Sequence, residues 1–382
     1  MNFRRNNVPA LLPQPDPLGF LEYSVVYTDR ALNHMSQRFQ GVMRDISRIL
    51  KDTYRAKAAV VVPGSGTFGM ESVARQFGTG KKCLVIRNGW FSYRWTQIFD
   101  MGHIPAEATV LKARRTGAGK QAPWTPPPVA EVVAAIAERR PDVVFAPHVE
   151  TSSGILLPDD YLRAVADAVH AAGGLFVLDC IASGAIWVDM AATGVDVLIS
   201  APQKGWSGSP CCAFVMLSER ARTAIDGTTS TSYACDLRKW LQMMEAYEKG
   251  GHAYHATMPT DALVHLRDAM KETEAFGFAQ ARAAQQELGT KVRALLASHG
   301  IASVAAPGFE APGVVVSYTE DPDLQSGRKF LELGLQTAAG VPLQCDEPAD
   351  FRTFRIGLFG LDKLASLDRT VERLGAALRR LK

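Results

Sequence analysis

Two charged residues that close apolar runs of the sequence have the types and the placement to do chemistry. Asp179 ends the run GLFVLD, and Lys204 ends the run DVLISAPQK. Both runs have the apolar, β-branched character of a buried strand. An acid and an amine at such positions lose hydration, which is unfavourable unless the charges serve a function. We therefore interpret Asp179 and Lys204 as candidate active-site residues.

A glycine-rich loop, GSGTFG at 64–69, lies between an apolar run and a helical pattern. It fits G-x-G-x-x-G, but backbone N–H groups at a helix N-terminus bind any phosphate, so the glycines alone do not choose the ligand. A dinucleotide is one alternative, with Arg87 at the end of the next apolar run as the partner of a 2′-phosphate. The hydroxyls of Ser65 and Thr67 favour a terminal phosphate monoester instead. A purely structural tight turn is the third alternative.

The acid, the amine and the loop together suit one cofactor, pyridoxal phosphate. Burial lowers the pKa of a lysine, which lets it form a Schiff base with an aldehyde. An aspartate can pair with the protonated pyridine nitrogen and keep the ring electron-poor. Taken singly, Lys204 could be a solvated strand-end lysine and Asp179 a cap of the next turn. Their combination with the loop predicts a pyridoxal phosphate site.

The pattern of the chain predicts an α/β fold with a mainly parallel sheet covered by helices on both faces. The predicted strands are Ala58–Val62, Cys83–Arg87, Asp142–Ala146, Gly174–Asp179, Val195–Ser200 and Cys212–Leu217. Helical spacing of apolar residues marks His34–Tyr54, Met70–Phe77, Pro128–Arg139 and Asp159–Ala172 between or before them. The carboxyl ends of parallel strands share one edge, which would bring the candidate residues together.

The pattern changes after about residue 260, which predicts a second, smaller α+β domain. One long helical segment, Ala262–His299, is followed by strand-like runs at Val314–Tyr318 and Phe354–Leu358 and by a closing helix, Lys363–Leu381. We predict an N-terminal arm over 1–30, a large cofactor-binding domain over 31–260 and a small C-terminal domain over 261–382.

Composition limits the class of protein. The 382 residues are 47% hydrophobic, and 42 basic against 39 acidic side chains give a net charge of only +3. No dense Lys/Arg run is present, which argues against nucleic acid as a partner. The six cysteines form no CxxC pair, and no apolar run has the length of a membrane span. We expect a cytoplasmic protein that binds no membrane and no metal.

Seven motifs, in order along the chain, resemble those of class V fold-type I pyridoxal-phosphate-dependent aminotransferases. They are PGSGTFGMES, NGWFSYR, HVETSSGILLP, LDCIASG, SAPQKGWSGSP, YHATMP and FRIGLFG. They are most similar to the alanine/serine–glyoxylate (or –pyruvate) branch, and FRIGLFG resembles the 2-aminoethylphosphonate branch. The resemblance implies a large domain with a seven-stranded, mainly parallel sheet and a smaller C-terminal α+β domain.

The resemblance also implies roles for individual residues. Lys204 matches the Schiff-base lysine, and Asp179 matches the partner of the pyridine nitrogen. The other implied cofactor contacts are Ser65, Gly66, Thr67 and Gln203 at the phosphate, Thr151 at the 3′-oxygen, Phe91 stacked on the ring, and Ile181 on the opposite ring face. Trp90, one position before Phe91, is an alternative for the stacking role.

Further residues match positions that shape the substrate pocket and the subunit interface of the family. Tyr254 and Thr257 match residues that reach the phosphate in the neighbouring subunit, which implies a homodimer with shared active sites. Arg355 matches the arginine that binds the substrate α-carboxylate. The segment Glu22–Thr28 replaces the usual N-terminal entry of the family, a region that often lines the substrate pocket.

The predicted function is transfer of an amino group from a small amino acid, such as alanine or serine, to glyoxylate or pyruvate in a ping-pong cycle. Alternatives within the fold are a 2-aminoethylphosphonate–pyruvate transaminase and a class V cysteine desulfurase or β-lyase. The desulfurases typically stack a histidine on the cofactor and need a mobile cysteine. Alternatives of other classes are an NADP-dependent oxidoreductase that uses the loop at 64–69 with Arg87, and a non-catalytic binding protein.

Overall fold

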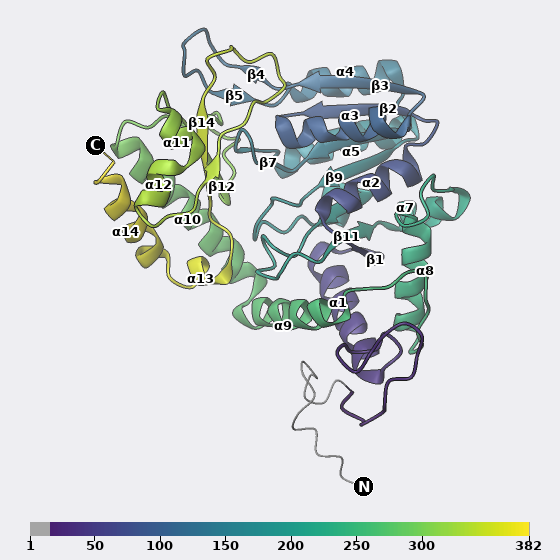
Figure 1. Cartoon of the computed structure of the whole chain (residues 1–382). Helices are drawn as coiled ribbons and strands as arrows, with labels where there is room; N and C mark the ends of the chain where they lie inside the picture. Colours follow the sequence, from purple (N-terminus) through teal and green to yellow (C-terminus); the bar gives the residue numbers. More distant parts are fainter. Residues whose placement is uncertain (1–15, 382) are drawn as a thin grey trace.

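The structure is a computed structural model that describes residues 16–381. Residues 1–15 of the predicted N-terminal arm, and residue 382, lie outside the described residues. Figure 1 shows a central sheet surrounded by helices, with the C-terminal strands and helices gathered on one side of it. The candidate residues lie where strands of this sheet end, at their carboxyl termini.

The central sheet has seven strands in the order β1-β11-β10-β9-β6-β2-β3. They are β1 Ala58–Pro63, β2 Lys82–Arg87, β3 Glu107–Lys112, β6 Val143–Pro147, β9 Leu175–Asp179, β10 Val197–Ser200 and β11 Cys212–Leu217. Strand β11 is antiparallel to both of its neighbours, and the other neighbouring pairs are parallel. The prediction of a mainly parallel seven-stranded sheet in an α/β fold is confirmed.

Helices cover the sheet on both faces, as its burial requires. Consecutive residues of β6, β10 and β11 are all buried, and an uncovered face would expose every second one. Helices α1, α2, α3, α5 and α8 pack directly against strands. The helices of this part are α1 Gln37–Tyr54, α2 Gly66–Phe77, α3 Trp90–Gly102, α4 Val129–Arg139, α5 Asp159–Ala172, α6 Met190–Thr193, α7 Glu219–Ala224 and α8 Leu237–Glu248.

A second, three-stranded antiparallel sheet lies in the C-terminal part, in the order β12-β14-β13. Its strands are β12 Val314–Tyr318, β13 Ala338–Ala339 and β14 Thr353–Gly357. Helix α9, Thr260–Phe276, packs on α1, whereas α10, Phe278–Ser298, packs on β12 and α14. The proposed boundary between 260 and 261 stays a prediction. Among the helices of residues 16–381, none combines the length and the apolarity needed to cross a membrane.

Several short strands and helices connect or extend these larger elements. They are β4 Arg114–Arg115, β5 Trp124–Thr125, β7 Val149–Glu150, β8 Ile155–Leu156, α11 Pro322–Ser326, α12 Arg328–Glu332, α13 Leu361–Leu364 and α14 Leu367–Leu378. Strands β7 and β8 form a small hairpin immediately after β6. The turn between them, residues 151–154, lies beside the carboxyl edge of the central sheet.

Two expectations for individual elements were wrong, and one strand of the central sheet was not predicted. The long helix predicted over Ala262–His299 is two helices, because Gly277 adopts φ +97°, which ends α9. The closing helix is likewise two, α13 and α14. Edge strand β3 was not predicted, because its residues are exposed or half-buried and its sequence, EATVLK, lacks the apolar run of the central strands.

The sheet brings the two candidate charges to one edge. Strands β9 and β10 are parallel neighbours, and Ile199 lies opposite Asp179 in their register. Lys204 follows the end of β10 at the same edge. Strand β1 runs in the same direction, since β11 is antiparallel to both β1 and β10, so α2 also begins there.

Close packing of α2 on the sheet depends on Gly69. A Cβ at Gly69 would lie 2.5 Å from Cβ of Ala213 and 3.2 Å from Cγ2 of Ile199. We expect Gly69→Ala to lower the free energy of unfolding by about 1–3 kcal/mol, because the helix must shift from the sheet. Urea unfolding of the cofactor-free protein measures the change.

Gly41→Ala on α1 is the matched control, since a Cβ there meets nothing within 4 Å. We expect this change to raise the free energy of unfolding by up to about 1 kcal/mol through helix propensity. Equal stability of the two variants would contradict the close-packing argument.

Candidate active site

Most of the predicted cofactor residues line one cavity of ≈ 210 Å³ at the carboxyl edge of the sheet. These are Ser65, Gly66, Thr67, Phe91, Thr151, Asp179, Ile181, Gln203 and Lys204. Four further residues, Met70, Arg94, Val149 and Ala182, complete the lining. The sequence places these residues on five separate segments, and only the fold brings them together.

The start of α2 leaves backbone N–H groups free at this cavity. Ser65 is the N-cap, but its side chain caps no N–H group, and its carbonyl oxygen accepts from Phe68 and Gly69. Within residues 16–381, the N–H groups of Gly66 and Thr67 have no hydrogen-bond partner. Free N–H groups at the positive end of a helix favour a bound anion.

Gly66 also brings the start of α2 close to a second wall of the cavity. A Cβ at Gly66 would lie 2.6 Å from Cδ1 of Ile181. The side chain of Ile181, which follows β9, therefore packs directly on the backbone of the α2 N-terminus. Any larger residue at position 66 would move either the helix or the loop after Asp179.

Asp179 is a buried acid with spare hydrogen-bonding capacity. The residue is 7% exposed, and its Oδ1 accepts the N–H of Ile181 at 2.9 Å. In the described part of the chain, Oδ2 accepts no hydrogen bond. The pKa of Asp179 is raised from 3.8 to about 6, chiefly by burial and also by nearby Glu150. The N–H of Ile181 and the cations Arg94 and Lys204 act in the opposite direction.

Lys204 is an amine whose charge is disfavoured by its surroundings. Burial lowers the pKa of Lys204, the cations Arg355 and Arg94 lower it further, and Asp179 raises it. Nζ forms no hydrogen bond or ion pair with any residue of 16–381, and it lies 5.2 Å from the ring centroid of Phe359. A lowered pKa increases the neutral, nucleophilic fraction of the amine.

The loop is held by close packing directly after Lys204. A Cβ at Gly205 would overlap the carbonyl oxygen of Gly184, so only glycine allows this approach. Trp206 is fully buried, with its ring centroid 4.7 Å from that of Trp187. These contacts fix the backbone on the carboxyl side of Lys204.

The aromatic wall of the cavity is Phe91. Trp90, the alternative for this role, does not line the cavity, and its ring lies against Tyr93 with centroids 5.6 Å apart. Both residues begin α3, where successive side chains point in different directions. The geometry therefore favours Phe91 over Trp90 for a stacking role.

Arg94 is a cavity residue that the sequence reasoning missed. Its Nη1 donates to Oγ1 of Thr67 at 3.1 Å, and its Cζ lies 5.2 Å from the ring centroid of Phe91. Arg94 ends the motif NGWFSYR, three positions after Phe91 on α3. Since residues at i and i+3 share a helix face, this spacing was the signal that could have found it.

Three predicted residues lie outside the cavity lining. Arg355 on β14 places its Cζ 5.3 Å from the ring centroid of Phe91, and its Nε donates to the carbonyl oxygen of Ala339 at 2.7 Å. Tyr254 and Thr257 share a hydrogen bond of 3.2 Å between their hydroxyls, and Tyr254 is 54% exposed. The structure therefore brings Arg355 close to the cavity but leaves the Tyr254–Thr257 pair apart from it.

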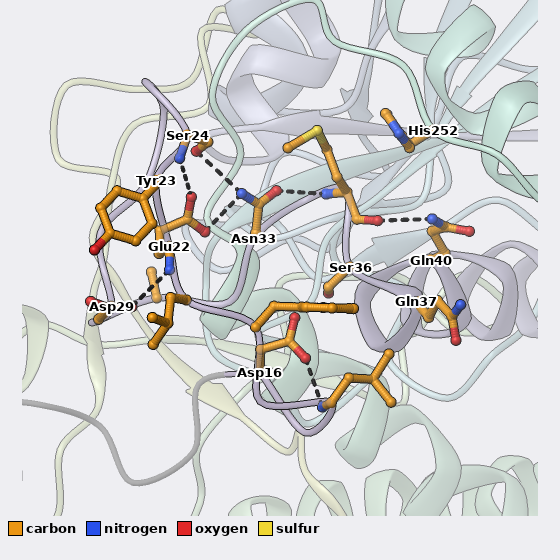
Figure 2. A pocket seen from close by; sticks show the side chains of 15 residues that line it. Asp16, Glu22, Tyr23, Ser24, Asp29, Asn33, Ser36, Gln37, Gln40 and His252 are labelled. Carbon is orange, nitrogen blue, oxygen red and sulfur yellow. Dashed lines mark hydrogen bonds between the residues drawn. The ribbon is translucent and has the colours of Figure 1, made fainter. Parts of the chain in front are cut away.

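The N-terminal segment forms a separate pocket of ≈ 620 Å³ (Figure 2). Its acidic centre is Glu22, whose carboxylate accepts from the N–H of Ser24 and from Nδ2 of Asn33, each at 2.8 Å. Figure 2 also shows His252 and Gln40 at the rim of this pocket. The segment that was expected to line the substrate pocket thus lines a different hollow of its own chain.

The features required by two alternative functions are not at the cavity. Arg87 is buried, and its guanidinium donates to Oγ1 of Thr96 at 2.9 Å and to the carbonyl oxygen of Gln344 at 3.2 Å. It does not line the cavity, so it is not placed to bind a 2′-phosphate there. All six cysteines are unpaired and buried, and none belongs to the described lining.

Replacing Asp179 by Asn tests the unfavourable burial of its charge. Folding raises the pKa of this carboxyl, so the folded state binds its proton more tightly and the charge destabilises the fold above about pH 6. We expect cofactor-free Asp179→Asn to be more stable than the wild type by ~2–3 kcal/mol at about pH 8. The gain should shrink as the pH falls through 6 and nearly vanish by about pH 4.

Urea unfolding of both cofactor-free proteins at several pH values measures this difference. Asn keeps the size of the side chain and an oxygen that can accept the N–H of Ile181, so the change isolates the charge. A gain that is independent of pH, or a loss of stability at about pH 8, would contradict the prediction.

Comparison with known proteins identifies the family. The sequence model of the class V aminotransferases matches residues 20–321. A 2-aminoethylphosphonate–pyruvate transaminase from Burkholderia ambifaria (strain MC40-6) is 31% identical over 363 residues, covering 92% of this chain and 89% of the relative.

Two solved structures share the fold. One is an alanine–glyoxylate aminotransferase from Nostoc sp. (TM-score 0.76, 21% identity, 90% of this chain and 88% of that chain), and the other is a ureidoglycine–glyoxylate aminotransferase from Bacillus subtilis (TM-score 0.73, 20% identity, 90% and 86%). Because the family match spans most of the sequence, the chain belongs to the class V aminotransferases, which are pyridoxal-phosphate-dependent enzymes.

Proposed function

We propose that this transaminase holds pyridoxal phosphate in the 210 Å³ cavity, with Lys204 as its covalent partner and as the catalytic base. One observation carries the proposal. A buried acid, a half-buried amine and the open N-terminus of α2 converge on a single cavity, and each has hydrogen-bonding groups without a partner among the described residues. Such groups are unfavourable in a buried site unless a ligand completes them.

The chemistry of these groups fits the cofactor. The free N–H groups of Gly66 and Thr67, with the hydroxyl of Ser65, match a phosphate monoester. The free Oδ2 of Asp179 matches a ring N–H, and the neutral fraction of Lys204 matches an aldehyde. Phe91 and Ile181 supply apolar surface for the two ring faces. Gln203 would add a donor at the phosphate and Thr151 a hydroxyl at the 3′-oxygen.

When bound, pyridoxal phosphate supplies an aldehyde that takes up an amino group and a ring that accepts negative charge from the adjacent carbon. Lys204 Nζ would remove the proton from the donor carbon that bears the amino group and would deliver it to the cofactor carbon that carried the aldehyde. Asp179 would keep the ring nitrogen protonated through its free carboxylate oxygen. The lowered pKa of Lys204 suits a base that works near neutral pH.

The substrates in this proposal are a small amino acid, such as alanine or serine, as donor and glyoxylate or pyruvate as acceptor. The donor product leaves before the acceptor binds, because both use the same site in turn. Arg355 would bind the carboxylate of both substrates, since its planar guanidinium allows two parallel hydrogen bonds. Only its Nε is engaged by a described residue, the carbonyl oxygen of Ala339.

A second candidate donor is 2-aminoethylphosphonate, with pyruvate as acceptor. Two observations favour it. The relative from Burkholderia ambifaria carries that activity in its name, and a curated relative from Paraburkholderia phymatum, 28% identical over 91% of this chain, has the same name. The second observation is Arg94, a cation in the cavity lining in addition to Lys204. A phosphonate carries more negative charge than a carboxylate and would gain from an additional cation.

The remaining alternatives lose support. Membership of the class V aminotransferases and the engagement of Arg87 both contradict an NADP-dependent oxidoreductase. A cysteine desulfurase would need a mobile cysteine near the amine, whereas all six cysteines are buried and none belongs to the described cavity lining. Six unpaired cysteines are consistent with the reducing cytoplasm, which we retain as the proposed location.

We also propose a homodimer in which each subunit completes the active site of the other. Tyr254 and Thr257 support this, because their hydroxyls form a pair outside the cavity of their own chain. Exposed apolar side chains support a covered surface: Leu18, Phe20, Leu21, Tyr23 and Val25 of the N-terminal segment are all more than half exposed. A second copy would cover this surface and present its Tyr254 to the neighbouring phosphate.

Adding pyridoxal phosphate to the cofactor-free protein tests the central proposal. We expect an absorbance band at about 400–430 nm, because a cofactor linked to the lysine is a conjugated imine, which absorbs in that range. Lys204→Ala should lose this band and at least about a thousandfold in transamination rate, because both the covalent link and the base are gone. Gln203→Glu serves as the control, since it should weaken phosphate binding through charge repulsion and still give the band at high cofactor concentration.

A panel of donors with pyruvate and with glyoxylate, read by product chromatography, then separates the two candidate donors. Turnover of alanine or serine supports the first, and preferential turnover of 2-aminoethylphosphonate, reduced in Arg94→Gln, supports the second. A coloured and fully active Lys204→Ala protein would overturn the whole proposal.

Paired variants test the shared active site. Tyr254→Phe with Thr257→Val removes two hydroxyls, and we expect about tenfold weaker cofactor binding or more. Co-expression of this double variant with Lys204→Ala should restore tight binding and activity, because one site of the mixed dimer then has every residue intact. Sedimentation equilibrium should give the mass of two 41.4 kDa chains. A single-chain mass, or no recovery on co-expression, would contradict the shared site.

A further inference from the structure

Glu150 is a fully buried carboxylate beside the cavity, and none of the salt bridges within residues 16–381 includes it. Oε1 accepts from the N–H of Phe91 at 3.1 Å and from Ser152, through its N–H at 3.1 Å and its hydroxyl at 2.8 Å. Oε2 accepts from Ser92, through its N–H at 2.9 Å and its hydroxyl at 2.7 Å. These hydrogen bonds, in place of a counter-ion, stabilise the buried charge.

The carboxylate lies at the N-terminus of α3, where it takes the place of a helix cap. Gly89 is the N-cap residue and has no side chain to bind the first N–H groups. Glu150 binds those of Phe91 and Ser92, and the hydroxyl of Ser152 binds that of Trp90 at 2.8 Å. A negative charge at this end of a helix is also favoured by the helix dipole.

The two segments approach so closely that they move as one unit. A Cβ at Gly89 would overlap the hydroxyl of Ser152 and would lie 2.8 Å from Cγ of Glu150. The hydroxyl of Ser153 also donates to the carbonyl oxygen of Asn88 at 2.9 Å. The loop before α3 and the β7–β8 turn therefore have little freedom to shift relative to each other.

Both segments contribute a wall to the cavity. Phe91, whose N–H is bound by Glu150, lines it from α3, and Thr151, the residue after Glu150, lines it from the β7–β8 turn. Glu150 itself does not line the cavity. Its hydrogen bonds thus set the distance between two walls that come from separate parts of the chain.

We propose that Glu150 is a positioning residue that holds Phe91 against the cofactor, so that cofactor affinity depends on a carboxylate that touches neither cofactor nor substrate. The proposal rests on the proposed function, because it assumes that pyridoxal phosphate occupies the cavity.

A double-mutant cycle on Glu150→Gln and Phe91→Leu tests whether the carboxylate acts through the ring. The measurement is the dissociation constant of pyridoxal phosphate for the cofactor-free proteins, by absorbance titration. Glu150→Gln turns an NH₂ group toward backbone N–H donors, and we expect the dissociation constant to rise about tenfold or more. In the Phe91→Leu background the same change should raise it by less than about threefold, since the ring is already gone.

Asp196→Asn is the matched control. Asp196 is also a buried carboxylate that accepts from a backbone N–H, that of Phe176 at 2.9 Å, and from the hydroxyl of Ser218 at 3.1 Å. It differs from Glu150 in that Nε2 of His170 lies 2.9 Å from Oδ2, and it lies just before β10, at the opposite edge of the sheet. We expect it to lower the melting temperature as Glu150→Gln does, yet leave the dissociation constant unchanged. If Glu150→Gln does not fold, the cycle is run with Glu150→Asp, which keeps the charge but withdraws it.

Three results would overturn the proposal. These are a wild-type dissociation constant in Glu150→Gln, effects of Glu150→Gln and Phe91→Leu that multiply independently, and an equal loss of affinity in Asp196→Asn. A wild-type protein that fails to bind pyridoxal phosphate at all would overturn the proposed function instead, so the two failures are distinguishable.

Discussion

The candidate active site depends on the loss of hydration at two charges, Asp179 and Lys204, at the ends of neighbouring strands. Burial pushes both toward their neutral forms, raising the pKa of the acid and lowering that of the amine. The fold tolerates this because the rest of the sheet is apolar and tightly covered. A ligand that carries an anion, a ring N–H and an aldehyde would relieve the unfavourable burial, which links cofactor binding to the stability of the protein.

Helices α2 and α3 both begin at this edge of the sheet. They differ in whether their first N–H groups have hydrogen-bond partners, and this difference defines the site. The N–H groups at the start of α3 are bound by Glu150 and Ser152, so that helix end is complete within the protein. The N–H groups of Gly66 and Thr67 at the start of α2 have no partner in the described chain. The positive end of α3 therefore binds Glu150, which fixes a wall of the cavity, whereas the positive end of α2 is free to bind a ligand.

The sequence predicted most of the fold because the central strands are buried on both faces and appear as continuous apolar runs. It did not predict β3, an edge strand without such a run, or the break at Gly277, where a single positive φ divides a helical pattern. It predicted Phe91 at the cavity but missed Arg94, because an arginine on a helix has many ordinary roles until its neighbours are known. The order of the strands leaves open both the division into domains and the roles of individual site residues.

The sequence by itself determined the α/β class, the family and the chemical types available at the site, since these follow from local apolar patterns and from ordered motifs. Tertiary structure decided which of those residues meet. It placed Phe91 rather than Trp90 at the cavity and left Tyr254 outside the cavity of its own chain. It also directed the guanidinium of Arg87 to hydrogen bonds outside the cavity. The physical reason is that burial, free hydrogen-bonding groups and pKa shifts arise from contacts between distant segments, which no local pattern contains.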